Sequence, residues 1–116
     1  MKPVAVLIHV PDVPAALAWY RAAFPGFRVS RPASEALAIL EGDGFDIEIV
    51  RADAKVPAGK GGSVLYWSVS SLEEARGRLV DIGAKPYRGP VPVGDGSSMC
   101  QLEDPFGNLL GLRGRP

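Results

Sequence analysis

Polar and apolar residues alternate along Gly44–Arg51, GFDIEIVR, in a pattern typical of a half-buried β-strand. The two isoleucines fall on one side of such a strand, and the other side carries Asp46, Glu48 and Val50. Carboxylates are seldom placed on a sheet face unless that face meets water or a ligand. This stretch is therefore the first candidate for a ligand-binding surface.

A second copy of the pattern lies near the C-terminus, in Gly107–Arg113, GNLLGLR. Leu110 and Leu112 take the places of the isoleucines, and Gly111 stands where Glu48 stood. The repeat predicts a duplicated chain with a cavity between its halves. One half has lost its carboxylate.

The first half begins with an apolar, β-branched run that predicts a strand at Val4–Val10. Its alternation places Ala5, Leu7 and His9 on the side away from a covering helix. A helix is predicted with Asp12 as the N-cap, Pro14 in the first turn and helix-forming residues over Ala15–Phe24, with one apolar face. Two short strands and a hairpin turn complete this half: Phe27–Ser30, Ala36–Glu41 and Gly42–Gly44.

The second half follows a polar, glycine-rich linker, Ala52–Gly62. A strand is predicted at Ser63–Val69 and a helix at Leu72–Ile82, with Ser71 as the N-cap and Gly83 ending the helix. The remaining predicted elements are two strands and a turn: Tyr87–Val93, Ser98–Leu102 and Glu103–Gly107.

The two halves superpose without a gap, VPDVPAALAWYRAAF on VSSLEEARGRLVDIG, starting with Val10 on Val69. We therefore predict a single α+β domain over residues 1–116, with modules 1–52 and 62–116 joined by the linker 52–62. Each module is strand, helix, then three strands. A module this small cannot cover its own sheet face, so it needs a partner module.

The charge balance and the apolar content of the chain limit the classes of binding partner that we expect. Thirteen basic and thirteen acidic residues cancel, so no net field favours nucleic acid or an anionic membrane. No apolar run approaches the roughly 20 residues of a membrane span, and the N-terminus does not resemble a signal peptide. The single cysteine, Cys100, indicates a reducing compartment and a small buried thiol. We expect a cytoplasmic protein whose partner is a small molecule.

Two stretches carry a family resemblance: VPDVPAALAWYRAAFPGF at Val10–Phe27 and EDPFGNLLGL at Glu103–Leu112. They resemble the signatures of the vicinal oxygen chelate superfamily, which contains glyoxalase I, extradiol dioxygenases, and bleomycin and fosfomycin resistance proteins. The resemblance implies two tandem βαβββ modules that form a curved mixed sheet around a cavity. It also implies a homodimer.

In metal-using members of that family, ligands come from the first and last strand of each module. In this chain the resemblance assigns those places to Ala5, Glu48, Val64 and Gly111. Only Glu48 has a side chain that binds metals, and one carboxylate falls short of the several protein ligands of a catalytic divalent site. We therefore expect no metal cofactor, with a divalent metal as the alternative.

The predicted pocket mixes apolar walls with a few directional groups, which is typical of a small-molecule site. Two readings of individual residues stay open: His9 is either a wall residue or a ligand contact, and Glu48 either meets the ligand or pairs with Arg51 or Arg113. The predicted pocket residues are His9, Leu7, Asp46, Glu48, Val50, Tyr66, Ser68, Leu109 and Arg113, with Ala5 and Val64 beside them.

Three functions fit this pattern. The first is a metal-free protein that binds or sequesters a small, partly apolar or cationic compound. The second is a metal-dependent lyase or dioxygenase of the glyoxalase type, with displaced ligands drawn from His9, Asp46, Glu48, Gln101 and Glu103. The third is a non-catalytic interaction module. Whether the protein is an enzyme depends on whether a metal binds.

Overall fold

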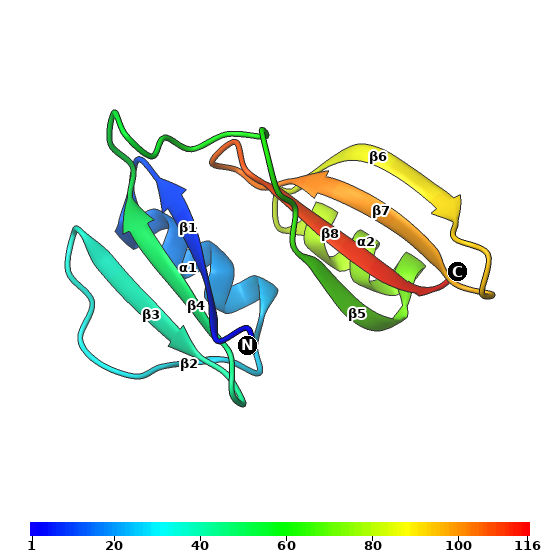
Figure 1. Ribbon diagram of the computed structural model, residues 1–116, viewed down its shortest axis with the longest axis horizontal. Coiled ribbons are helices and arrows are strands. Elements are labelled where there is room, and N and C mark those ends of the chain that lie inside the picture. Colours follow the sequence, from blue (N-terminus) through cyan, green and yellow to red (C-terminus); the bar gives the residue numbers. More distant parts are fainter. The chain divides into compact units, whose positions relative to one another are not determined.

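The computed structural model describes residues 1–116, which form two compact units, Met1–Ala58 and Gly59–Pro116. Each unit has one four-stranded sheet, with one helix against one face of that sheet (Figure 1). The boundary between the units falls inside the predicted linker 52–62. The α+β class with two tandem modules is therefore confirmed.

Unit 1, Met1–Ala58, has the strand order β1-β4-β3-β2. Strand β1 runs parallel to β4, and the other neighbours are antiparallel. Its elements are β1 (Ala5–Val10), α1 (Val13–Ala23), β2 (Arg28–Val29), β3 (Leu37–Glu41) and β4 (Asp46–Arg51).

Unit 2, Gly59–Pro116, repeats this topology with the order β5-β8-β7-β6. Strand β5 runs parallel to β8, as β1 does to β4. Helices α1 and α2, of 11 and 10 residues, are neither long nor apolar enough to cross a membrane. The elements of this unit are β5 (Tyr66–Ser71), α2 (Leu72–Asp81), β6 (Lys85–Pro92), β7 (Ser98–Glu103) and β8 (Leu109–Arg115).

The core of each unit lies between the helix and its sheet. In unit 1, Ile47 and Ile49 are fully buried, and α1 packs on β3 and β4. In unit 2, Leu110 and Leu112 hold the equivalent positions and are also buried. The alternation read from the sequence is therefore correct for both strands, and it leaves the intervening residues on the opposite face. We call that opposite face the open face of each sheet.

Both helices begin at a capped residue. The Asp12 side chain accepts a hydrogen bond from the Ala15 N–H at 3.1 Å, and the Ser71 hydroxyl accepts one from the Glu74 N–H at 3.2 Å. The gapless superposition of the two halves aligns Asp12 with Ser71. The two caps thus occupy equivalent places in the repeat, which is the local signal that starts each helix.

Replacing Ser71 by alanine should lower the free energy of unfolding by about 1 kcal/mol, because one N–H of the first turn of α2 loses its acceptor. Ser70→Ala is the matched control, since this exposed neighbour does not cap the helix. Urea denaturation followed by circular dichroism measures both changes. Equal stability of the two variants would contradict the capping role.

Several boundaries differ from the predictions. Strand β5 starts at Tyr66 rather than Ser63, so Val64, expected on this strand, precedes it. The Leu65 carbonyl oxygen accepts a hydrogen bond from the Gly111 N–H at 2.9 Å, so the contact with β8 begins just before Tyr66. Strand β2 has only two residues. Helix α1 starts at Val13, directly after the predicted cap Asp12.

The linker is not featureless. The Asp53 carboxylate accepts hydrogen bonds from the N–H groups of Lys55 and Val56, which closes a tight turn. Its last part is attached to unit 2, because the Gly59 N–H donates to Asn108 Oδ1 at 2.9 Å. Residues from Gly59 onward therefore belong structurally to the second unit.

Candidate functional site

The open face of unit 1 carries the Glu48 carboxylate between two aliphatic side chains. In the parallel pairing Leu7 lies opposite Glu48, and in the antiparallel pairing Glu48 lies opposite Ile39. Directly opposite residues share a face, so Glu48 is flanked on both sides by aliphatic groups. Each row consists of one residue from β1, one from β4 and one from β3. The row on one side of Glu48 is Ala5, Asp46 and Glu41, and the row on the other side is His9, Val50 and Leu37.

The Glu48 carboxylate is not paired with Arg51. The Arg51 guanidinium instead lies 3.6 Å from the Glu35 carboxylate and donates to the Glu35 carbonyl oxygen at 2.8 Å. Residues three apart on a strand point to opposite faces, which explains why this pair does not form. Glu41, in the next row, is bound to Arg28 at 2.6 Å. Asp46 and Glu48 are thus the carboxylates of this face that form no ion pair, and Glu48 is the one with aliphatic side chains on both sides.

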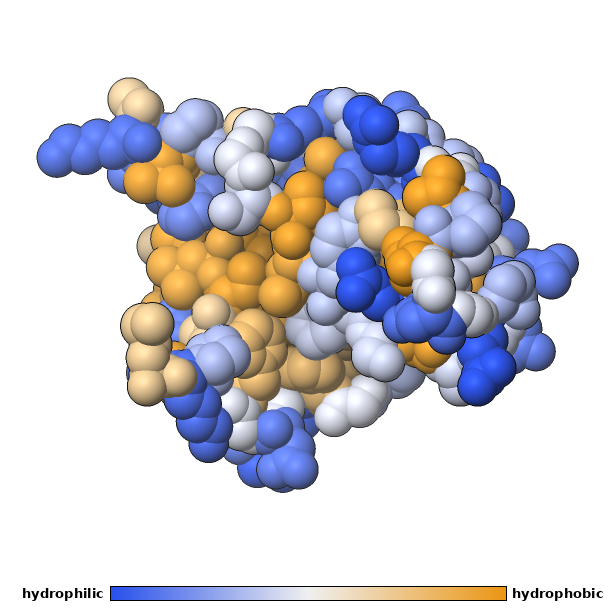
Figure 2. All heavy atoms as spheres, turned by 45° about the vertical axis from the view of Figure 1, so that its right-hand side comes forward, coloured by the Kyte–Doolittle hydropathy of each residue, from blue (hydrophilic) through white to orange (hydrophobic).

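Part of that apolar surface reaches solvent. Leu7 is 52% exposed and Val4 is 65% exposed, although both are large aliphatic residues near or on β1. Figure 2 shows hydrophobic side chains at the surface of the face that it draws, with hydrophilic ones around them. Exposed apolar surface of this kind is commonly used for binding.

The open face of unit 2 is built around Tyr66 and Gly111. The two residues lie opposite each other in the β5–β8 pairing, and Gly111 lies opposite Gln101 in the β7–β8 pairing. A Cβ atom at position 111 would stand 2.5 Å from Cδ2 of Tyr66, so the tyrosine ring rests directly on the glycine backbone. The ring fills the space into which a side chain at position 111 would project.

Two polar groups hold the Tyr66 side chain. The Gln101 side-chain amide donates a hydrogen bond to the Tyr66 hydroxyl oxygen at 2.8 Å. The Arg113 guanidinium carbon lies 5.8 Å from the centre of the ring, within the range of a cation–π contact. Arg113 is therefore engaged with Tyr66 inside unit 2. Gln101, which the sequence analysis named as a candidate displaced metal ligand, is the residue bonded to this tyrosine.

The residues do not fit the metal centre that the family resemblance implies. Of the four ligand places, Ala5 and Val64 are aliphatic, and Gly111 is covered by the Tyr66 ring. Only Glu48 offers a side-chain oxygen, and within either unit no three His, Cys, Asp or Glu side chains are close enough to hold a metal ion. A divalent catalytic site needs several protein ligands, so one carboxylate does not make this donor set.

The predicted pocket residues divide between the two open faces. Each group shares one face of its own sheet, as the alternation requires. The sequence missed Ile39, which is buried beside Glu48, and the role of Gln101. Leu7, His9, Asp46, Glu48 and Val50 lie on the open face of unit 1, and Tyr66, Ser68, Leu109 and Arg113 lie on that of unit 2.

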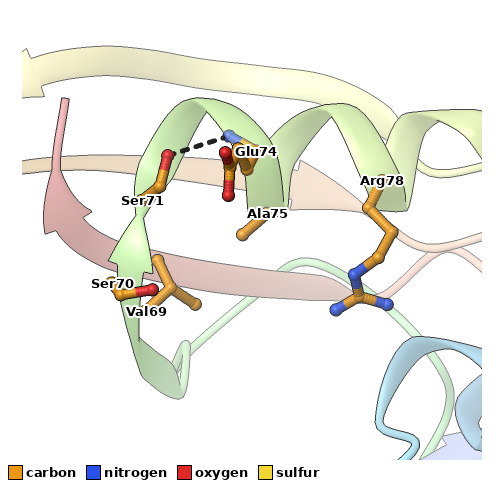
Figure 3. Close-up of a pocket in the computed structure, with 6 residues that line it drawn as sticks. All are labelled: Val69, Ser70, Ser71, Glu74, Ala75 and Arg78. Atoms are coloured by element: carbon orange, nitrogen blue, oxygen red, sulfur yellow. Dashed lines mark hydrogen bonds between the residues drawn. The ribbon is translucent and has the colours of Figure 1, made fainter.

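A separate hollow of about 370 Å³ lies where β5 runs into α2. In Figure 3 the Ser71 hydroxyl is bonded to the backbone nitrogen of Glu74, and Arg78 extends from the next turn of the helix. The hydroxyl is therefore used to cap α2. None of the predicted pocket residues lines this hollow, which consists of Val69, Ser70, Ser71, Glu74, Ala75 and Arg78.

The cysteine is part of the core. Cys100 is buried on the helix side of β7, opposite Leu112. Burial raises the pKa of its thiol, with a smaller opposing effect from Arg76. A neutral, buried thiol is a weak nucleophile, which agrees with the structural role predicted for it.

The comparisons with known proteins agree with this architecture. The family model of the glyoxalase/bleomycin resistance protein/dioxygenase superfamily matches residues 2–112. The chain belongs to this superfamily. Among curated proteins, none matches the sequence.

Solved structures share the fold at low sequence identity. A family enzyme from Burkholderia phytofirmans PsJN has a TM-score of 0.80 at 18% identity, covering 97% of this chain and 98% of that one. A glyoxalase/bleomycin resistance protein from Albidiferax ferrireducens T118 has a TM-score of 0.74 at 22% identity, with the same coverage of 97% and 98%. TioX from Micromonospora sp. ML1 has a TM-score of 0.71 at 19% identity, covering 100% of both chains. At these identities the likeness concerns the fold, and the site must be argued from its own residues.

Proposed function

We propose that this chain is a small-molecule-binding protein that sequesters a partly apolar, cationic compound without a metal ion. The observation that carries the proposal is the row Leu7, Glu48 and Ile39 on the open face of unit 1. Aliphatic groups on both sides offer apolar contact area, and the carboxylate between them offers one directional charge. That combination suits an aromatic or aliphatic cation better than a neutral or anionic compound.

The absence of competing partners supports the role of Glu48. Arg51 is engaged by Glu35, and Arg28 by Glu41, so the nearby arginines of unit 1 are already paired. A ligand cation does not have to displace an existing ion pair. Asp46, two residues along the same strand face, adds negative charge to the same side.

Benzyltrimethylammonium is a suitable probe, and benzyl alcohol is its neutral counterpart. We expect the cation to raise the melting temperature of the wild type and to bind about fivefold more weakly to Glu48→Gln, because a partly exposed ion pair contributes about 1 kcal/mol. Glu35→Gln is the matched control, since it removes an equal charge from the same unit at an exposed site. Isothermal calorimetry measures the affinities. Unchanged affinity in Glu48→Gln would refute the proposed role of this carboxylate.

Titration with Ni²⁺, Zn²⁺, Mn²⁺ and Fe²⁺ under the same conditions distinguishes the metal-free binding protein from the metal-dependent enzyme. The proposed function predicts no stoichiometric binding at low micromolar metal. Tight binding that Glu48→Gln abolishes would instead favour a lyase or dioxygenase of the glyoxalase type.

A further inference from the structure

The open face of unit 2 differs in charge from that of unit 1. Unit 1 presents Asp46 and Glu48, whereas unit 2 presents a tyrosine hydroxyl, a serine hydroxyl and an arginine. Ser68 and Arg113 lie directly opposite each other, one residue pair along from Tyr66 and Gly111. The two halves of the duplicated chain therefore carry different polar groups on equivalent faces.

The Tyr66 hydroxyl keeps a hydrogen to donate. A hydroxyl has one O–H donor and two acceptor lone pairs. The Gln101 amide donates to the Tyr66 oxygen at 2.8 Å and so occupies a lone pair, which leaves the tyrosine hydrogen for another acceptor. The ring cannot turn freely, because it rests on Gly111. The donor is thus held in a defined position.

The Arg113 guanidinium, which lies over the Tyr66 ring, is not neutralised by an ion pair. Arg113 contacts the Tyr66 ring and has no carboxylate within salt-bridge distance. Glu103, the acid on the same face, is paired with Lys60 at 3.2 Å. Hydrogen bonds from Ser97 lower the pKa of the exposed Asp95, and Arg113 contributes least to that shift.

We propose that Tyr66 and Arg113 form a binding subsite for a carboxylate, with Gln101 as a positioning residue. A carboxylate accepts hydrogen bonds only, so it matches one fixed O–H donor and one guanidinium. The inference rests on the proposed function in that the chain binds small molecules. It adds an anionic ligand class, at a different face and with different residues from Glu48.

Sodium benzoate is the probe, and benzamide is its neutral counterpart of nearly the same shape. Chemical shift changes in ¹⁵N spectra of the full chain give both the affinity and the location. We expect benzoate to shift resonances of β5, β7 and β8, and to bind about tenfold more tightly than benzamide, because hydrogen bonds to a charged acceptor are the stronger ones.

Three variants separate binding from folding. Tyr66→Phe keeps the ring on Gly111 but removes the donor, and it should reduce the preference for benzoate about tenfold. Arg113→Gln should weaken the binding of benzoate and leave the affinity for benzamide unchanged. Arg76→Gln, which removes the same charge from α2, should change neither affinity. Melting temperatures verify that each variant is folded.

The positioning role of Gln101 has its own test. Gln101→Glu has nearly the same shape but can only accept from the tyrosine hydroxyl. The tyrosine hydrogen would then point at the new carboxylate, and the preference for benzoate over benzamide should disappear at an unchanged melting temperature. A purely structural role of Gln101 would move the melting temperature and leave the ratio of the two affinities intact.

The outcomes separate this inference from the proposed function. Equal binding of benzoate and benzamide, or an undiminished preference in Tyr66→Phe, overturns the carboxylate subsite. If benzyltrimethylammonium still binds through Glu48 in that case, the proposed function stands alone. Binding of benzoate that depends on Tyr66, without binding of the cation, supports the subsite and overturns the cationic ligand.

Discussion

Replacing Ile49 by alanine should destabilise the protein by about 2–5 kcal/mol, because a fully buried side chain leaves a cavity between β4 and α1. Replacing Leu7, on the open face of the neighbouring strand, should cost about 0.5 kcal/mol, because this side chain is 52% exposed. Urea denaturation followed by tryptophan fluorescence measures both. The loss expected for the Ile49 variant is a large fraction of the free energy of unfolding of an ordinary domain.

The two substitutions also differ in their effect on binding. Leu7→Ala removes part of the apolar wall beside Glu48 and should weaken benzyltrimethylammonium binding, whereas the folded fraction of Ile49→Ala should bind it normally. If Leu7→Ala were the more destabilising variant, the assignment of the two faces of β1 and β4 would be wrong.

Replacing Gly111 by alanine should destabilise the protein by about 1–3 kcal/mol, because the added methyl group overlaps the Tyr66 ring. The ring atoms concerned, Cγ, Cδ2 and Cε2, include those nearest the backbone, so they cannot move away as the end of a flexible chain would. In a Tyr66→Ala background the overlap is gone. There the same substitution should be neutral or stabilising by about 0.5 kcal/mol, since it lowers the entropy of the unfolded chain.

A double-mutant cycle measures this coupling, which we expect to exceed about 1 kcal/mol. Gly77→Ala is the matched control, because position 77 lies within α2 with open space around its Cβ. That substitution should stabilise the protein by about 1 kcal/mol through helix propensity. Additive effects at positions 66 and 111 would show that the ring does not rest on the glycine in solution.

The sequence predicts the fold well because strong local signals agree with one another. The alternation around Ile47 and Ile49 assigns both faces of β4, and Asp12 and Ser71 start both helices. The hairpin turn before β4 also forms as predicted, with the Gly42 N–H bonded to the Phe45 carbonyl oxygen. Each of these features depends on residues close together in the chain.

The site is harder to predict because it depends on which strands are neighbours and in which register. A glycine at position 111 looks like a lost ligand until the β5–β8 pairing places Tyr66 opposite it. Gln101 belongs to a third strand, so its bond to Tyr66 joins residues 35 positions apart. No local pattern carries that information.

One open alternative could have been settled from the sequence. Glu48 and Arg51 are three residues apart on one strand, and the period of two places them on opposite faces. The structure agrees, because Arg51 turns to Glu35. The start of β5 is a different case, since a glycine-rich approach carries no sharp boundary signal.

The contact between Tyr66 and Gly111 also couples the residues that these two positions accept. A glutamate placed at position 111 alone would overlap the ring, and a small residue at position 66 alone would uncover the glycine backbone and remove the acceptor of the Gln101 amide. A larger side chain at position 111 therefore requires a smaller one at position 66, and the two substitutions have to be made together.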